Sequence, residues 1–183
     1  HLREKGKPVH VLDIASGHGC YVLDALAAEA LPESVRLRDY SPINVAAGQA
    51  LIAERGLQKV ATFDEVNAYE RANYQNLNPR PTLGIVSGLH ELFPDNDLIL
   101  QSLYGFGDAI EPGGYLIYTG QPWHPQLEMI ARCLSSHREG QDWVMRRRSQ
   151  QEMDQLVEKA GFEKVHQWID DDGIFTVSLA VKK

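Results

Sequence analysis

Short apolar runs alternate with longer amphipathic segments along most of this 183-residue chain. Runs rich in β-branched and aromatic residues predict five strands, at residues 9–14, 35–39, 60–63, 83–87 and 115–119. Helical spacing of apolar residues between them predicts helices, notably from residue 22, at 42–55 and at 95–110. Such alternation is typical of a mostly parallel sheet with helices on both faces.

The last part of the chain follows a different pattern. Residues 165–169 and 174–181 are predicted as strands, and only the segment from Asp170 to Gly173 separates them. That length permits a hairpin but no helical crossover, so the two strands must be antiparallel. We therefore predict an α/β, Rossmann-like, doubly wound sheet of seven strands, six parallel and one antiparallel, in a single domain spanning 1–183.

Start signals strengthen two of the predicted helices. Ser41 precedes Pro42, a typical N-cap followed by proline at the first helical position. Ser149 and Glu152 form a capping-box pattern before a second apolar stripe. For the helix after Ser41, we expect the side chains facing the sheet to be Ile43, Ala46, Ala47, Ala50 and Leu51.

Composition narrows the functional classes. A formal net charge of −7 argues against unselective binding of nucleic acid. No apolar run is long enough for a membrane span and no charged-then-apolar leader is seen, so we expect a cytoplasmic protein with no membrane partner. Cys20 and Cys133 lack a paired spacing, which predicts two free thiols. The first strand closely follows His1, which leaves room for a further domain of the same polypeptide.

A glycine turn joins the first strand to the first helix. Gly17 and Gly19 let a ligand lie against the backbone and direct N–H groups toward it. Dinucleotides and S-adenosylmethionine both use such turns, but the dinucleotide motif needs a third glycine where this chain has Val22. An ordinary tight strand-to-helix connection is the alternative interpretation.

The turn resembles motif I of the class I S-adenosylmethionine-dependent methyltransferases, with Asp13 as the acidic residue and Ala15 in place of the first glycine. Glu111-Pro112-Gly113-Gly114 resembles the turn before strand five in that family. The chain as a whole is similar to bacterial putative methyltransferase domains of unassigned substrate, some of them fused to a hydrolase-like domain. The resemblance implies the Rossmann-like fold and S-adenosyl-L-methionine as cofactor.

The resemblance also implies a set of cofactor contacts. Asp39, at the end of the second strand, can accept hydrogen bonds from both ribose hydroxyls. The alternative is that Asp39 only stabilises the start of the following helix. Adenine would be held after the third strand, where we align Asn67 and Ala68 with the family's adenine contacts. Asp64 is the competing candidate for that role. The expected cofactor-binding residues are Asp13, Ala15, Ser16, Gly17, Gly19, Asp39, Tyr40, Asn67, Ala68, Ser87 and Gly88.

Candidates for chemistry follow the fourth and fifth strands. His90 is the best candidate for a general base, against a structural histidine as the alternative. Trp123 and His124 are expected to line the acceptor pocket, although packing explains Trp123 equally well. The run from Arg146 to Arg148 either grips an anionic substrate or forms a solvated strand edge, and we favour the second interpretation.

The sequence thus predicts methyl transfer from S-adenosylmethionine to an unidentified acceptor, most simply a small molecule. Neither a metal nor a covalent enzyme intermediate is expected, because a sulfonium methyl group is already activated. The alternative is a non-catalytic S-adenosylmethionine-binding or interaction module within a larger protein.

Overall fold

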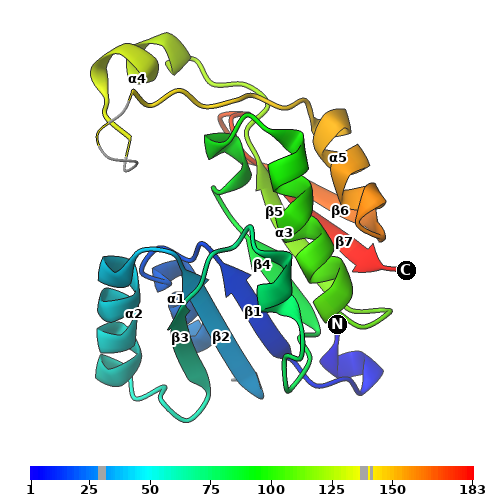
Figure 1. Ribbon diagram of the computed structural model, residues 1–183. Helices are drawn as coiled ribbons and strands as arrows, with labels where there is room; N and C mark the ends of the chain where they lie inside the picture. Colours follow the sequence, from blue (N-terminus) through cyan, green and yellow to red (C-terminus); the bar gives the residue numbers. More distant parts are fainter. Residues whose placement is uncertain (29–31, 137–139, 141) are drawn as a thin grey trace.

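The described residues form one seven-stranded sheet, in the order β3-β2-β1-β4-β5-β7-β6 (Figure 1). The structure is a computed structural model that describes residues 1–28, 32–136, 140 and 142–183. Strand β7 pairs antiparallel with β5 and with β6, and the other pairs are parallel, which confirms the predicted sheet. The strands are β1 His10–Ile14, β2 Ser34–Asp39, β3 Ala61–Glu65, β4 Leu83–Val86, β5 Tyr115–Gly120, β6 Phe162–Ile169 and β7 Thr176–Lys182.

Helices connect the strands and build two hydrophobic cores. The α-helices are α1 Cys20–Ala28, α2 Pro42–Glu54, α3 Asn96–Ala109, α4 Leu127–Cys133 and α5 Gln150–Lys159, and the 3-10 helices are η1 Arg3–Lys5, η2 Arg71–Tyr74 and η3 His90–Leu92. Leu12 of β1 packs into a core that includes buried residues of α3 and α5, whereas its neighbour Val11 packs into a core with α1 and α2. Successive strand residues point to opposite faces, so β1 contributes to both cores.

The predicted helix caps are present. Ser41 Oγ accepts a hydrogen bond from Asn44 N at 3.4 Å, and Pro42 is the first residue of α2. Ser149 Oγ accepts from Glu152 N at 3.1 Å and caps α5. The Glu152 carboxylate bonds Arg146 and Asn96, so the capping interaction comes from the serine.

The buried face of α2 differs from the prediction. Val45, Gly48 and Ile52 are its buried residues, and Ile43 is 76% exposed. Gly48 lies so close to β3 that a β-carbon there would come within 2.2 Å of the Phe63 ring. The sequence prediction failed because the alanines of α2 fit an exposed or a buried position equally well, so apolar residues occur on several faces of this helix.

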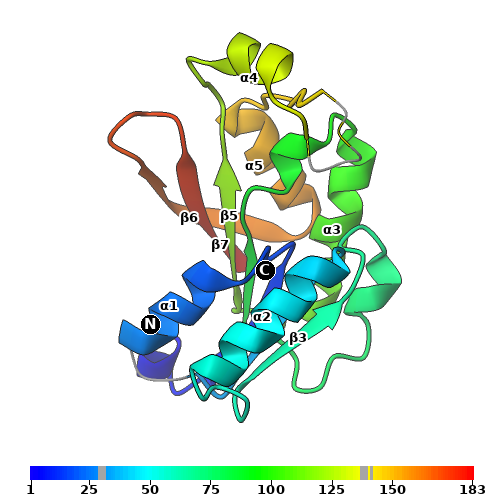
Figure 2. The same ribbon diagram turned by 90° about the vertical axis from the view of Figure 1, so that its left-hand side faces the viewer.

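Helix α4 extends beyond the carboxyl edge of the sheet (Figures 1 and 2). It begins soon after β5, and the chain then returns across that edge to α5. None of its residues is buried, and Met129 is about half exposed. The predicted apolar side, Leu127, Ile130, Ala131 and Leu134, is therefore only partly covered.

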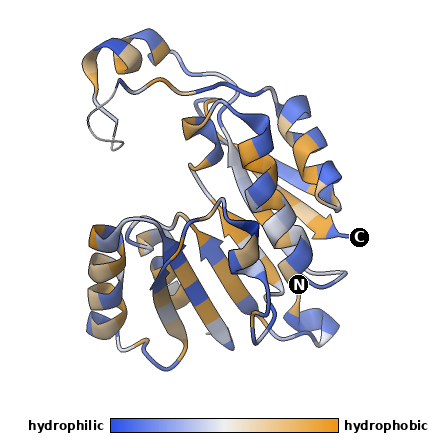
Figure 3. Ribbon diagram, in the orientation of Figure 1, coloured by the Kyte–Doolittle hydropathy of each residue, from blue (hydrophilic) through white to orange (hydrophobic). Residues whose placement is uncertain are grey.

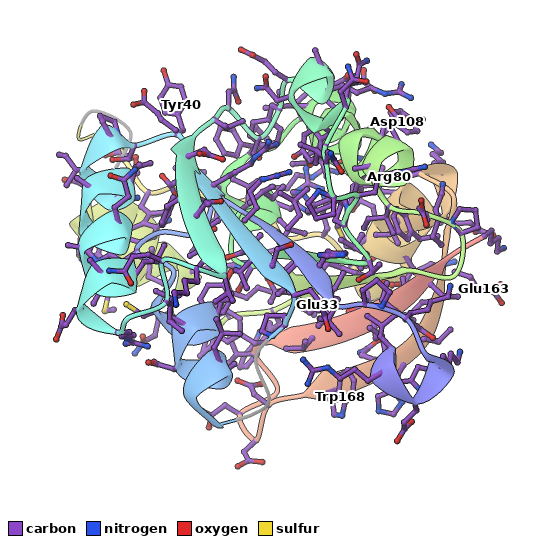
Figure 4. All side chains as sticks on the ribbon, turned by 90° about the horizontal axis from the view of Figure 1, so that it is seen from below. Glu33, Tyr40, Arg80, Asp108, Glu163 and Trp168 are labelled. Carbon is purple, nitrogen blue, oxygen red and sulfur yellow. The ribbon has the colours of Figure 1, made fainter. Side chains whose placement is uncertain are left out.

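One face of the terminal hairpin is also uncovered. Apolar positions run along the strands of the sheet, including β7 (Figure 3). Helix α5 packs on one face of β6 and β7, where Phe162 and Ala180 are buried. On the opposite face Trp168 lies beside Val177 in the register, and it is 51% exposed (Figure 4).

Cys20 and Cys133 are exposed and unbridged, as predicted. Within the described part of the chain, no helix has both the length and the apolar character needed to cross a bilayer.

Candidate functional site

The predicted site residues lie at one edge of the sheet. Strands β1 to β5 run parallel to one another, so their carboxyl ends meet at that edge, where ligands bind in open α/β sheets. Two hydrogen bonds join neighbouring loops there: Ser16 N donates to Arg38 O at 3.0 Å, and Gly88 N donates to Thr119 Oγ1 at 2.9 Å. The fold thus brings residues from five separate segments together.

The turn after β1 depends on left-handed backbone. Gly17 and Gly19 have φ of 58° and 73°, and a β-carbon on Gly19 would come within 2.6 Å of Leu37. Ala15 has φ of 51°, which is costly for a residue with a β-carbon. The backbone at Ala15 therefore keeps the conformation that a glycine would adopt, and the substitution does not remodel the turn.

Asp39 ends β2 and holds the glycine turn in place. The carboxylate accepts from Gly17 N at 2.9 Å through Oδ2, and from Ser41 N at 2.9 Å and the Asn44 side chain at 3.1 Å through Oδ1. A carboxylate has roughly four lone-pair sites, so one remains, on Oδ2. Asp39 can accept a hydrogen bond from one ribose hydroxyl there. To accept from both ribose hydroxyls, it would have to share or release its bond to Gly17, Ser41 or Asn44.

Asp13 is fully buried beneath the same turn. Tyr21 Oη donates to Asp13 Oδ1 at 2.6 Å, and Oδ2 has no hydrogen-bond partner within the described residues. Burial raises the pKa of Asp13 to about 7, although the hydrogen bond from Tyr21 works in the opposite direction. Asp13 therefore has one unused acceptor oxygen, and whether its carboxyl group is ionised depends on what binds next to it.

The loop after β3 uses its own polar groups. Asn67 Oδ1 accepts from Tyr69 N at 3.0 Å, and its amide nitrogen donates to Glu70 at 3.2 Å. Ala68 is buried, and its carbonyl accepts from Tyr74 Oη at 2.7 Å. The amide oxygen of Asn67 is thus already engaged in the loop, with one lone pair left for an adenine amino group.

Tyr40 is one of the exposed residues among the expected cofactor contacts. Its side chain is 75% exposed and stands out from the end of β2 (Figure 4). Ser87 and Gly88 follow β4, and Gly88 has φ of 70° and is exposed. The two positions after β4 are therefore open to a ligand, whereas Tyr40 would have to turn inward to cover one.

His90 is buried against α3. Its side chain is 3% exposed, and its Nε2 lies 2.9 Å from the hydroxyl of Ser102 on α3. Burial and the nearby charge of Arg148 lower its pKa to about 3. A buried imidazole of such low basicity is poorly suited to take a proton from an acceptor, so this geometry does not support the expected general-base role.

The arginine run is not a solvated strand edge. Arg148 is buried and donates to the carbonyls of His90 at 2.6 Å and Phe93 at 2.9 Å. Arg146 donates to the carbonyl of Pro94 at 2.5 Å and pairs with Glu152. These arginines fasten the segment before α5 to the connection between β4 and α3, which corrects the interpretation that we favoured from the sequence.

Trp123 and His124 lie between β5 and α4. Trp123 is 56% exposed, and His124 Nδ1 accepts a hydrogen bond from Gln126 N at 3.0 Å. Neither is packed into a core. Their place in the chain keeps them near the edge, at the start of the segment that leads to α4.

S-adenosylmethionine requires open space at the turn and polar groups for its ammonium and its ribose. A β-carbon on Gly17 or Gly88 would meet no atom within 4 Å, so both glycines border open space. The unpartnered oxygen of Asp13 suits the ammonium, and the remaining lone pair of Asp39 suits a hydroxyl. The residues at this edge therefore fit that cofactor.

Two side chains near this edge are not marked by the sequence pattern. Tyr21 lies on α1, eight residues after Asp13, and donates a hydrogen bond to it. Glu91 was not given a role, yet it is a buried acid on η3. The signal for Glu91 is its position a few residues after β4, next to His90, in a segment that follows the binding edge.

Comparison with known sequences identifies the family. Residues 1–182 match the family described as "Putative methyltransferase". The uncharacterized protein YnbC of Escherichia coli strain K12 is 59% identical over 182 residues, which cover all of this chain and 31% of that protein. The chain thus spans about a third of the length of this curated relative.

Solved structures share the fold at low sequence identity. An O-methyltransferase family protein from Burkholderia thailandensis is 17% identical, with a TM-score of 0.77, over 97% of this chain and 52% of that one. A SAM-dependent methyltransferase from Methanosarcina mazei is 20% identical, with a TM-score of 0.71, over 94% and 92%. A possible exported protein from Bordetella parapertussis is 22% identical, with a TM-score of 0.76, over 96% and 62%. The chain belongs to the putative methyltransferase family.

Proposed function

We propose that this protein transfers a methyl group from S-adenosylmethionine to a small-molecule acceptor. The observation that carries the proposal is the pair of carboxylates at the glycine turn. Asp39 keeps one lone pair while it holds Gly17, and Asp13 keeps one oxygen without a partner. These are the groups that a nucleoside with an amino-acid tail needs from a protein.

The chain's own residues would position the cofactor and leave the chemistry to it. The bound cofactor supplies an activated methyl group on a sulfonium. Asp39 orients the ribose, and Asp13 pairs with the ammonium. The open backbone at Gly88 leaves room for an acceptor at the end of β4. Catalysis then rests on in-line positioning and on exclusion of water.

Isothermal titration calorimetry tests the cofactor site directly. S-adenosylmethionine and S-adenosylhomocysteine should bind, and NAD should not. Asp39→Ala should weaken the binding at least tenfold, because it removes the ribose acceptor and loosens Gly17. Asp171→Ala, in the exposed hairpin loop, is the matched control and should bind like the wild type. Binding of NAD in place of S-adenosylmethionine would refute the proposal.

A second candidate is a non-catalytic S-adenosylmethionine-binding module of a larger protein. It is favoured by the length comparison, because the relative with 59% identity is about three times as long as the matched region. Labelled S-adenosylmethionine and a metabolite pool distinguish the two candidates. Methyl transfer by this chain alone excludes the module, whereas transfer only by a full-length protein supports it.

A further inference from the structure

Glu91 is a buried carboxylate at the end of β4, next to the expected site of methyl transfer. Its side chain lies on η3 and is 8% exposed. Oε1 accepts a weak hydrogen bond from Thr119 Oγ1 at 3.4 Å. Oε2 has no hydrogen-bond partner among the described residues. The carboxylate therefore keeps one oxygen ready for another molecule.

Such an arrangement is costly unless a ligand uses it. Buried polar atoms in folded proteins almost always have a partner, and an unpartnered buried carboxylate oxygen is expensive. Within the described part of the chain, no basic nitrogen lies within 4.0 Å of Glu91. Burial raises the pKa of Glu91, and the charges of Arg147 and Arg148 act in the opposite direction.

The space beside Glu91 is very small. A cavity of about 10 Å³, the room of one water molecule, lies between the ends of β4 and β5 and the start of α5. Its lining includes Glu91, Thr119, Gln121, Arg148 and Gln150. A single hydroxyl group matches that size, whereas a bulky group does not. An acceptor could place one hydroxyl here and keep the rest of its structure outside.

The charges around the cavity favour a neutral or anionic acceptor. Arg146 is paired with Glu152, so its charge is balanced. Arg147 donates to Gln121, and Arg148 donates to main-chain carbonyls and Asn96, all neutral partners. Arg147 and Arg148 thus bring two positive charges to the single carboxylate of Glu91. Their net positive field would repel a protonated amine.

We propose that Glu91 binds the nucleophilic hydroxyl of the acceptor and takes its proton, and that the acceptor is a small hydroxylated acid. The inference rests on the methyl transfer proposed above. The hydroxyl oxygen forms a bond to the methyl carbon as the carbon–sulfur bond breaks, and that bond's electron pair stays on sulfur. The hydroxyl proton passes to the Glu91 carboxylate and then to water. Glu91 thereby takes the role that sequence reasoning gave to His90.

Two matched pools test the acceptor class. One pool contains aliphatic and aromatic hydroxy acids, and the other contains the same skeletons with an amino group in place of each hydroxyl. Each pool is incubated with methyl-labelled S-adenosylmethionine and the protein. Label should appear in the hydroxy-acid pool. Label in the amine pool alone, or in neither pool when calorimetry shows the cofactor bound, would overturn the proposal.

Variants then test Glu91 itself. Glu91→Gln keeps the shape and removes the base, so turnover should fall by about 10²-fold or more while S-adenosylmethionine affinity stays unchanged. Glu163→Gln on β6 is the control, because Glu163 is an exposed glutamate far from this edge (Figure 4). Wild-type turnover by Glu91→Gln would refute the role of Glu91 and leave the proposed function intact. If the wild-type protein does not bind S-adenosylmethionine at all, the proposed function is refuted instead.

Glu91→Asp keeps the inference testable if Glu91→Gln fails to fold. It retains a carboxylate but withdraws it from the cavity, so the rate should fall and the acid limb of the rate–pH profile, which this carboxyl sets, should move to a different pH. A purely structural Glu91 would leave the acid limb of Glu91→Asp at the wild-type pH, and that result would contradict the inference.

Discussion

Asp13 is a carboxylate that the fold removes from water, with a hydrogen bond from the neutral Tyr21 hydroxyl. Its pKa of about 7 lies above the ordinary aspartate value of 3.8. Between those values the folded protein holds a proton that the unfolded chain has lost, so folding stability falls as the pH rises through this window. Folding makes Asp13 hold its proton more tightly. Binding of the cofactor should make Asp13 release that proton, because the positive ammonium group favours the charged carboxylate.

The first prediction concerns the stability of the protein without ligand. A rise of about three pKa units corresponds to roughly 4 kcal/mol, so Asp13 should lower the free energy of unfolding by an amount of that order between pH 4 and pH 8. Asp13→Asn should remove most of this fall. Urea denaturation at several pH values measures it, and parallel curves for the two proteins would contradict the prediction.

The second prediction concerns binding. At pH 6, S-adenosylmethionine should release a proton from Asp13, and its affinity should increase from pH 6 to pH 8. Calorimetry in buffers of different ionisation enthalpy measures the proton directly. Tyr21→Phe removes a bond that favours the charged form and should shift the dependence to higher pH. An affinity that does not change with pH would exclude this coupling.

Sequence reasoning succeeded for residues whose position in the chain fixes their place in space. Asp39 ends a strand of a parallel sheet, so the pattern placed it at the binding edge. His90 and Glu91 follow the same strand, but the sequence could not tell which of them faces the core. Both residues line the small cavity, but His90 Nε2 is engaged with Ser102 on α3, whereas Glu91 Oε2 has no partner among the described residues. The two residues are adjacent on η3, so their side chains point in different directions from the same short helix.

At the level of elements, α2 gives a direct test of which helix face is buried. Ile52 is 4% exposed and Ile43 is 76% exposed on the same helix. Ile52→Ala should lower the free energy of unfolding by about 2–4 kcal/mol, whereas Ile43→Ala should change it by less than about 0.5 kcal/mol. Chemical denaturation of both variants checks this. A larger fall in the free energy of unfolding for Ile43→Ala than for Ile52→Ala would mean that the face predicted from the sequence is the buried one.

Helix α4 has little to hold it in place in the absence of ligand. It has no buried residue, and Met129 and Leu134 are each about half exposed beyond the carboxyl edge of the sheet. We expect S-adenosylhomocysteine to slow amide hydrogen exchange in α4, because a bound ligand at that edge gives the helix a surface to pack against. Exchange in α5, already packed on α3, should change little. Equal slowing in both helices would point to global stabilisation instead.

The sheet as a whole was predictable because connection lengths decide strand direction. Four residues between the last two strands exclude a crossover, and long helical connections elsewhere permit parallel pairing. Element bounds were less accurate: β6 begins at Phe162, three residues before the predicted start, and a register shift between Lys164 and His166 interrupts its pairing. A bulge of this kind depends on contacts across the sheet, which local pattern does not record.

The position of β7 has a consequence for how the protein acquires its structure during synthesis. β7 comes last in the sequence, yet it lies between β5 and β6. A ribosome releases β6 first, and β6 then has no strand of the sheet to pair with until β7 follows. A nascent chain that stops at Gly173 should therefore be protease-sensitive from Phe162 onward, whereas a chain that reaches Lys183 should be protected. Protection of the shorter chain would mean that α5 alone can hold β6.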